Sequence, residues 1–174
     1  ASMLKALHDL PQLTVALVDG PAFGGGAGLA AACDMAVATE RSSFAFSEVK
    51  LGLTPATISP YVIRAIGARN AKRLFATGQV FGAAEAQRFG LVDQVVPDAA
   101  AFEAVRADLT ARIKLAAPGA VADAKDLVND IEGAEIDHGV MEETARRIAA
   151  RRISPEGREG VLAFLEKRKP GWAE

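Results

Sequence analysis

A run of glycines, Gly24-Gly25-Gly26-Ala27-Gly28, joins an apolar segment to a helix of small residues. Glycine can adopt positive φ and lets a ligand come close to its backbone N–H group. At the start of a helix such N–H groups lack intrahelical acceptors, and the helix dipole favours negative charge there. The run could therefore hold an oxygen atom as it gains negative charge, and a purely structural tight turn is the alternative.

Two other uses of glycine-rich turns fit this run poorly. It is not a G-x-G-x-x-G sequence, and no acidic residue follows at the distance that a dinucleotide site requires. The chain also contains no Gly-Lys-Ser or Gly-Lys-Thr, which argues against a phosphate-binding P-loop.

Glu48 is the second candidate for chemistry. It follows an apolar strand and precedes a loop marked by Gly52 and Pro55. A carboxylate on a loop that a rigid sheet positions can serve as a general acid or base. Taken alone, an exposed Glu48 or one paired with Lys50 is the simpler interpretation.

Other reactive side chains lack the patterns that catalysis or metal binding needs. His8 and His138 lie in helical segments without partner residues, and we interpret both as structural or surface residues. Cys33 is the single cysteine and is expected to be a small buried residue. The sequence has neither a metal-ligand spacing nor a G-x-S-x-G motif, so no metal is predicted.

Composition is that of an ordinary globular domain in a reducing compartment. The 174 residues are 50% hydrophobic and 24% charged, with a net charge of −2. Basic and acidic residues are interleaved, which argues against nucleic-acid binding and indicates solvated helix faces. No apolar stretch approaches the roughly 18 residues of a membrane span, and no signal peptide is evident, so we expect a cytoplasmic protein without a membrane partner.

The elements around these residues alternate between strand and helix up to residue 98 and are helical beyond it. Apolar runs at 14–18, 35–39, 43–46 and 91–96 predict strands, which indicates an α/β layout. Glycines at 67, 78 and 90 are expected to end short helices. We therefore predict an α/β region at 1–98 and a helical region at 99–174. The expected helices are 62–66, 71–77, 83–89, about 99–116, 119–131, 138–152 and 155–168, with an N-cap and Pro155 opening the last.

Several segments together resemble the crotonase (enoyl-CoA hydratase/isomerase) superfamily in order and spacing. They include the glycine run within VDGPAFGGGAGL at 18–29, CDMAVA at 33–38 and FSEVKLGL at 46–53. The resemblance continues through RAIG at 64–67, ATG at 76–78, AAEA at 83–86, FGLV at 89–92 and EGVLAFLEKRKP at 159–170.

This resemblance implies a fold and an assembly. It implies a crotonase-type spiral of ββα units followed by a C-terminal all-helical trimerisation region, with self-association as a homotrimer or a dimer of trimers. The first amphipathic pattern opens at Met3 without a leading cap. We therefore expect that the N-terminal portion of the family fold is missing from this sequence.

The resemblance also implies catalytic residues. The Gly25 N–H would hold the thioester oxygen as it becomes an enolate, with Gly24 and Gly26 in the same substrate-binding turn, and a second amide would come from a segment preceding the matched region. Glu48 matches the second of two glutamates in the family's hydratases. The first would stand at Gly28, which has no side chain, so ordinary hydration by two acids is in doubt.

Further resemblances concern the substrate. The stretch at 54–60, which includes Pro55 as a substrate-binding residue, resembles a branch that acts on carboxylated, branched enoyl-CoAs such as 3-methylglutaconyl-CoA. Gly28 could leave space for such an acyl chain. Phe164 and Lys167 match positions that contact the adenine or 3′-phosphate of coenzyme A, while a core Phe and a solvated Lys are the alternative.

The resemblance therefore favours a lyase that adds water reversibly to a 2-enoyl-CoA thioester. A 3,2-enoyl-CoA isomerase that uses Glu48 alone is the first alternative, and a non-catalytic acyl-CoA-binding homologue is the second. Coenzyme A would be part of the substrate, and no separate cofactor is expected.

Overall fold

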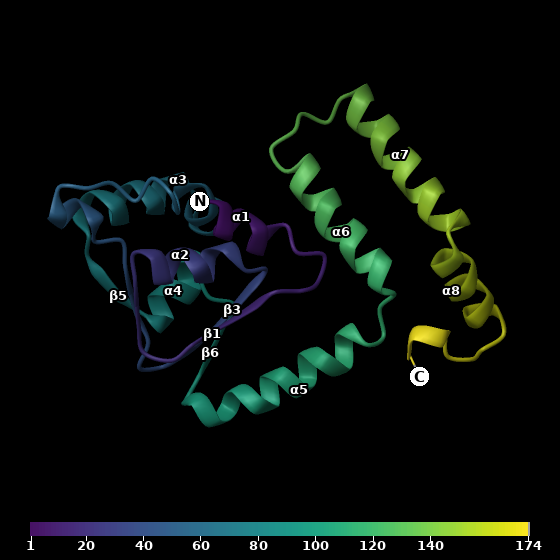
Figure 1. Ribbon diagram of the computed structural model, residues 1–174, viewed down its shortest axis with the longest axis horizontal. Helices are drawn as coiled ribbons and strands as arrows, with labels where there is room; N and C mark the ends of the chain where they lie inside the picture. Colours follow the sequence, from purple (N-terminus) through teal and green to yellow (C-terminus); the bar gives the residue numbers. More distant parts are fainter. Residues whose placement is uncertain (174) are drawn as a thin grey trace. The chain divides into compact units, whose positions relative to one another are not determined.

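The computed structural model describes residues 1–173, which form two compact units (Figure 1). The first unit is Ala1–Arg106, and the second begins at Ala107. The sequence predicted a boundary after residue 98, where a short 3-10 helix, η2 (Ala99–Ala101), leads into helix α5 (Phe102–Ile113).

The first unit contains two three-stranded sheets. One is parallel, in the order β1 (Val15–Val18), β3 (Met35–Thr39), β6 (Gln94–Val96). In the other, β4 (Ser43–Ala45) pairs in parallel with β2 (Pro21–Phe23) and antiparallel with β5 (Val80–Gly82). Phe23 is in register with Ala45. Because β2 and β4 run in parallel, the residues that follow them, the glycine run and Glu48, leave the sheet at the same edge.

The helices of the first unit begin and end largely where glycine and apolar patterns predict. Helix α2 contacts α1, α3 and strands β1, β2 and β3. Gly78 (φ 55°) and Gly90 (φ 88°) end α3 and α4 in the left-handed conformation, and Gly67 (φ 73°) interrupts α3. The helix ends at Gly78 and Gly90 were predicted correctly, whereas Gly67 was expected to end a helix and instead kinks α3, which joins the two helices expected at 62–66 and 71–77. The helices are α1 (Ser2–His8), α2 (Gly25–Ala32), α3 (Ser59–Thr77), α4 (Ala83–Phe89) and the 3-10 helix η1 (Glu48–Leu51).

A cluster of phenylalanine rings anchors strand β4. Phe44, Phe46 and Phe81 are fully buried, and the ring centroids of Phe44 and Phe81 lie 5.8 Å apart. Phe46 also meets Phe75 of α3 edge to face at 5.2 Å. Burying each such ring contributes roughly 1.5–3 kcal/mol, so the strand that leads to Glu48 is held firmly.

The second unit consists of helices. Helices α6 and α7 run antiparallel, because Asp123 and Asp130 of α6 pair with Arg151 and Arg147 of α7 in reverse order. No helix within residues 1–173 is both long and apolar enough to cross a membrane. Beyond α5 the elements are α6 (Pro118–Ile131), α7 (His138–Ile153), α8 (Pro155–Leu165) and the 3-10 helix η3 (Gly171–Ala173).

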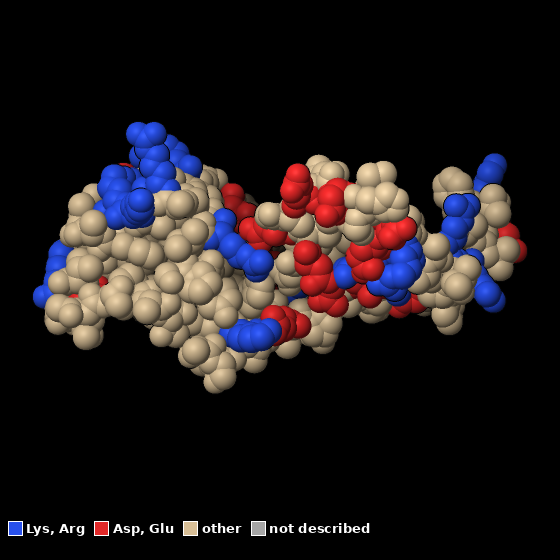
Figure 2. All heavy atoms as spheres, turned by 90° about the horizontal axis from the view of Figure 1, so that it is seen from above, with Lys and Arg blue, Asp and Glu red and all other residues tan. Residues whose placement is uncertain are grey.

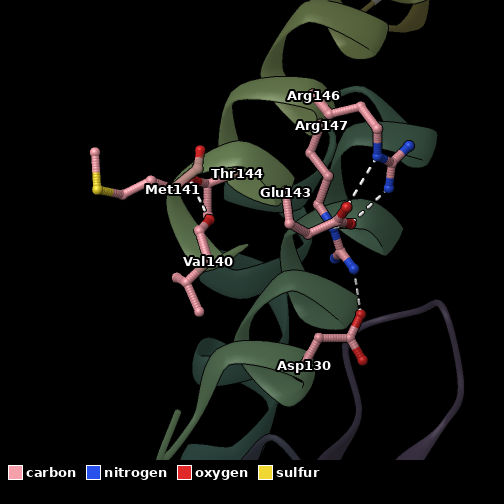
Figure 3. A network of polar contacts seen from close by, with 7 residues as sticks. All are labelled: Asp130, Val140, Met141, Glu143, Thr144, Arg146 and Arg147. Atoms are coloured by element: carbon pink, nitrogen blue, oxygen red, sulfur yellow. Dashed lines mark hydrogen bonds and ion pairs between the residues drawn. The ribbon is translucent and has the colours of Figure 1, made fainter. Parts of the chain in front are cut away.

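Carboxylate–guanidinium pairs connect the helices of this unit (Figure 3). Glu143 accepts hydrogen bonds from Arg146 and from Nε of Arg147, and Nη2 of Arg147 donates to Asp130. The two guanidinium groups, Arg146 first, hold the pKa of Glu143 at about 2. On the face shown in Figure 2, acidic and basic side chains of this unit lie next to one another, as the interleaving of acidic and basic residues in the sequence predicted.

Glu156 of α8 caps the start of helix α6. It accepts a hydrogen bond of 3.0 Å from the Gly119 N–H and pairs with Arg151. These contacts, the Gly119 N–H first, lower the pKa of Glu156. Ser154 caps α8 itself, because its Oγ accepts from the Gly157 N–H at 3.0 Å and Pro155 follows, as predicted.

Replacing Glu156 with glutamine should destabilise the protein near pH 7 by about 1 kcal/mol, the typical value of a helix cap. Because folding lowers the pKa of Glu156, its charge stabilises the fold above the pKa of the unfolded chain, and this contribution is lost as the pH falls through the folded pKa. Urea unfolding of both proteins at several pH values should show the difference shrinking toward acid pH. The exposed Glu135→Gln variant serves as the control, and an equal loss there would contradict the assignment.

The structure corrects the expected end of the last helix. Helix α8 ends at Leu165 rather than at 168 because Lys167 adopts φ 54°, and it is the one non-glycine residue with positive φ within residues 1–173. The Lys167 N–H donates to Phe164 O and the Arg168 N–H to Ala163 O, which is the Schellman pattern. Glycine usually occupies this position, so the lysine is held there against a backbone preference.

Candidate active site

Gly24 makes the turn between strand β2 and helix α2. Its φ of 51° and ψ of −115° lie in a region that side chains other than glycine rarely occupy. Its N–H donates to Ala45 O at 2.8 Å, and its carbonyl accepts the Gly28 N–H at 3.0 Å. The turn is therefore fixed to strand β4 on one side and to the helix on the other.

The next two amides are available to a ligand. Gly25 and Gly26 are exposed and form the first residues of α2, whose start has no side-chain cap. Within residues 1–173, their N–H groups find no hydrogen-bond acceptor. Two donors at a helix start, where the dipole is positive, can hold an oxygen atom that carries negative charge.

A polar network holds the corner before this turn. Asp19 accepts hydrogen bonds from Arg41 and from the buried Thr39 hydroxyl, and the Arg41 guanidinium, followed by that hydroxyl, lowers the pKa of Asp19. The buried Ser42 hydroxyl donates to Val18 O and accepts from the Gly20 N–H. The turn between β3 and β4 thus fixes the chain that leads into β2 and the glycine run.

Glu48 lies against the glycine turn. A Cβ placed on Gly24 would be 3.2 Å from Oε1 of Glu48, so the missing side chain of Gly24 makes room for this carboxyl group. Its second oxygen, Oε2, is buried and has no hydrogen-bond partner among the described residues. A buried polar atom without a partner is costly, and functional groups are a common reason for one.

The simpler interpretation of Glu48, as an exposed or lysine-paired residue, is wrong. Glu48 is half-buried, and no ion pair within residues 1–173 joins it to Lys50. The Lys50 chain instead passes over Gly78, with its Cε 3.1 Å from the position of a Cβ there. The carboxylate and the two exposed amides therefore lie beside the same turn.

The structure also corrects the role expected for Gly28. A Cβ at this buried position would lie 2.2 Å from Cγ2 and 2.7 Å from Cβ of Ile58. Ile58 is itself 95% buried, since 5% of its surface is exposed. The expectation that Gly28 leaves open space for an acyl chain is wrong, because Ile58 fills that space. No sequence pattern signalled this contact, which joins residues 30 positions apart.

Comparisons with known proteins identify the family of this chain. The model of the enoyl-CoA hydratase/isomerase family matches residues 1–174. The chain belongs to the enoyl-CoA hydratase/isomerase family. It is 38% identical over 169 residues to the enoyl-CoA hydratase AKT6-1 of Alternaria alternata, covering 96% of this chain and 56% of that protein.

Solved structures of the family share the fold. An enoyl-CoA hydratase from Shewanella pealeana is 42% identical with a TM-score of 0.89, covering 98% of this chain and 63% of that one. An enoyl-CoA hydratase/isomerase from Marinobacter aquaeolei is 35% identical with a TM-score of 0.93, covering 99% and 65%. These neighbours confirm the predicted crotonase-type α/β fold with C-terminal helices. The chain spans less than two thirds of each of these three relatives.

The remaining predicted site residues of this family member lie in two places. Pro55 is buried in the loop before α3, where its carbonyl accepts the Ser59 N–H at 3.0 Å. Phe164, 81% exposed, and the exposed Lys167 lie together at the end of α8 in the second unit. Phe164 is therefore not a core residue, and its role in binding coenzyme A stays a prediction.

The two histidines have the structural or surface settings that were expected. The His8 ring packs edge to face on Tyr61 with centroids 5.5 Å apart, and its Nε2 lies 2.8 Å from an Arg64 guanidinium nitrogen. His138 is 84% exposed.

Proposed function

We propose that this chain contributes the enolate-binding amide and the acid/base carboxylate of an enoyl-CoA hydratase. The reaction is the reversible addition of water to a 2-enoyl-CoA thioester. The observation that carries the proposal is the Glu48 carboxyl group, with its buried and unpartnered Oε2, against the turn that presents the Gly25 N–H. The family match and the relatives named as hydratases support the same class of substrate.

Each group has a defined task in this reaction. The Gly25 N–H donates to the thioester oxygen, which gains negative charge as the oxygen of water attacks C3. The resulting enolate then takes a proton at C2. Glu48 accepts a proton from the water and delivers one to C2, so the carboxyl group ends in its starting state. One such amide typically contributes about 10²–10³ in rate, and one acid/base group about 10²–10⁴.

A second candidate is 3,2-enoyl-CoA isomerisation on the same framework. Ile58 fills the space beside Gly28, so a second carboxylate has no place there and Glu48 is the acid that faces the turn. A single carboxylate can remove a proton from C2 of a 3-enoyl-CoA and return it at C4, while the same amide holds the dienolate. This route requires no bound water.

A substrate panel separates the candidates. The absorbance of the conjugated enoyl thioester is followed with crotonyl-CoA, 3-methylglutaconyl-CoA and a 3-enoyl-CoA. Loss of absorbance with a 2-enoyl substrate supports hydration, and a gain with the 3-enoyl substrate supports isomerisation. The carboxylated substrate is included because the loop at 54–60, with Pro55, resembles a branch that uses such chains. Thioester binding without turnover would overturn both enzymatic proposals in favour of an acyl-CoA-binding homologue.

Lys167 and Phe164 are proposed to bind the nucleotide end of coenzyme A. A lysine is a suitable charge for phosphate, and an exposed phenylalanine is a suitable stacking face. Lys167 has φ 54°, where glycine is the ordinary residue. A binding role would explain why a charged side chain stands at this position.

The Lys167→Gly variant should therefore be more stable than the unsubstituted protein and bind coenzyme A more weakly. Relief of the backbone preference is expected to raise the free energy of unfolding by about 0.5–1 kcal/mol. Loss of the charge should weaken coenzyme A binding by roughly tenfold, the value of one charge-assisted contact. Urea unfolding and calorimetric titration measure the two effects. Lys169→Ala removes the same charge nearby, and an equal loss of affinity in that variant would contradict the assignment.

Self-association as a homotrimer, or as a dimer of such trimers, is proposed for the helical region. Many apolar side chains of the second unit are exposed, among them Leu115 at 69%, Ile136 at 85% and Leu165 at 70%. Exposed apolar surface of this kind is typical of protein interfaces. Sedimentation velocity at several concentrations tests the proposal, and a monomer at all of them would contradict it.

A further inference from the structure

Two glycines, Gly24 and Gly28, lie one turn apart at the start of helix α2. The Gly28 N–H donates to Gly24 O at 3.0 Å, so the two residues follow the helical spacing of i and i+4. Gly24 is the N-cap of α2, so this bond places the two glycines one turn apart at the start of the helix. Neither glycine has a side chain, so neighbouring elements can pack directly on the backbone there.

Two different side chains occupy the space above these glycines. Oε1 of Glu48 lies 3.2 Å from the Cβ position of Gly24, and Cγ2 of Ile58 lies 2.2 Å from that of Gly28. The carboxyl group and the aliphatic side chain are therefore neighbours along α2, one turn apart. Of these two side chains, Ile58 is the apolar one, beside the carboxyl group that a thioester held at the Gly25 N–H has to reach.

We propose that Ile58 is a specificity-determining residue of this site, packed over Gly28 beside Glu48, where it limits the hydrocarbon substituents that the acyl group can carry near C3. The proposal rests on the proposed function, because it needs an acyl thioester bound at the Gly25 N–H. The Ile58 atoms that face the Gly28 position, Cβ, Cγ2 and Cδ1, are all aliphatic carbons, so its effect is one of shape. Removing part of its side chain enlarges the site on that side.

Binding of two saturated thioesters tests this without any need for turnover. Butanoyl-CoA and 3-methylbutanoyl-CoA differ by one methyl group at C3. In Ile58→Ala, the ratio of their Kd values should shift by about tenfold in favour of the branched thioester relative to the unsubstituted protein, which is the typical effect of one methylene in an apolar pocket. Ile58→Val removes one methyl group and should shift the ratio in the same direction by roughly threefold.

Ile66→Ala is the matched control. Ile66 lies on helix α3, whose N-cap residue is Ile58, and is buried in the core with 3% of its surface exposed. This variant removes the same atoms and lowers stability in the same way, so its Kd ratio should stay that of the unsubstituted protein.

The outcomes distinguish this proposal from the proposed function. Unchanged Kd ratios in both Ile58 variants, or an equal shift in Ile66→Ala, would overturn the role of Ile58. If the unsubstituted protein binds neither thioester, both the role of Ile58 and the proposed function are overturned. A shifted ratio in a protein that turns over no enoyl-CoA would support Ile58 and overturn only the catalytic assignment.

Discussion

Glu48→Gln should lower kcat for the preferred enoyl-CoA by about 10²–10⁴, the usual contribution of a general acid/base group. Glutamine keeps the shape of the side chain against Gly24, so the position of the turn should not change. Because the loss concerns proton transfer, KM should change far less than kcat. Initial rates from the enoyl absorbance, measured across substrate concentrations, give both values.

The control for this variant is Glu40→Gln, which removes a carboxylate from an exposed residue directly after strand β3. Its kcat should remain that of the unsubstituted protein. A Glu48→Gln protein with nearly full activity would remove the acid/base role, since Glu48 is the carboxylate within residues 1–173 that contacts the glycine turn.

Local sequence patterns predicted much of the scaffold because their physical causes are local. Glycine at positions 67, 78 and 90 takes positive φ, which few other residues tolerate, so the interruption of α3 and the ends of two helices could be placed from sequence. Apolar runs likewise placed β1 and β3. Strands β2 and β5 were not predicted, because each has three residues and depends on its pairing with β4.

The site was predicted less completely, because its properties depend on residues distant in sequence. The glycine run and Glu48 were both recognised as candidates, but their contact at Gly24 arises from the parallel pairing of β2 with β4. Ile58 was part of a recognised stretch, yet only the fold shows that it fills the space at Gly28. The polar network of Asp19, Arg41 and Ser42 was not predicted, because such polar side chains give no periodic pattern in the sequence.

Gly24→Ala should displace both the Gly25 N–H and the Glu48 carboxyl group. Alanine at φ 51° and ψ −115° is strained by roughly 1–3 kcal/mol, and its Cβ would press on Oε1 of Glu48 from 3.2 Å. Relaxation of the turn moves the Gly25 N–H, and relaxation of the carboxyl group moves the acid. We expect kcat to fall by about 10²–10³, the effect of losing one oxyanion donor, together with a lower Tm.

The Gly133→Ala variant distinguishes the effect of backbone strain on activity from the effect of a change within the site. Gly133 has a comparable φ of 74° in the loop between α6 and α7, and nothing lies within 4 Å of its Cβ position. The free energy of unfolding of the Gly133→Ala protein should fall by a similar amount, while its kcat stays near that of the unsubstituted protein. Enoyl-CoA assays below the melting temperature of both variants make the comparison. If the two variants lose activity equally, the loss reflects general destabilisation, and the Gly24 turn has no special part in holding the enolate.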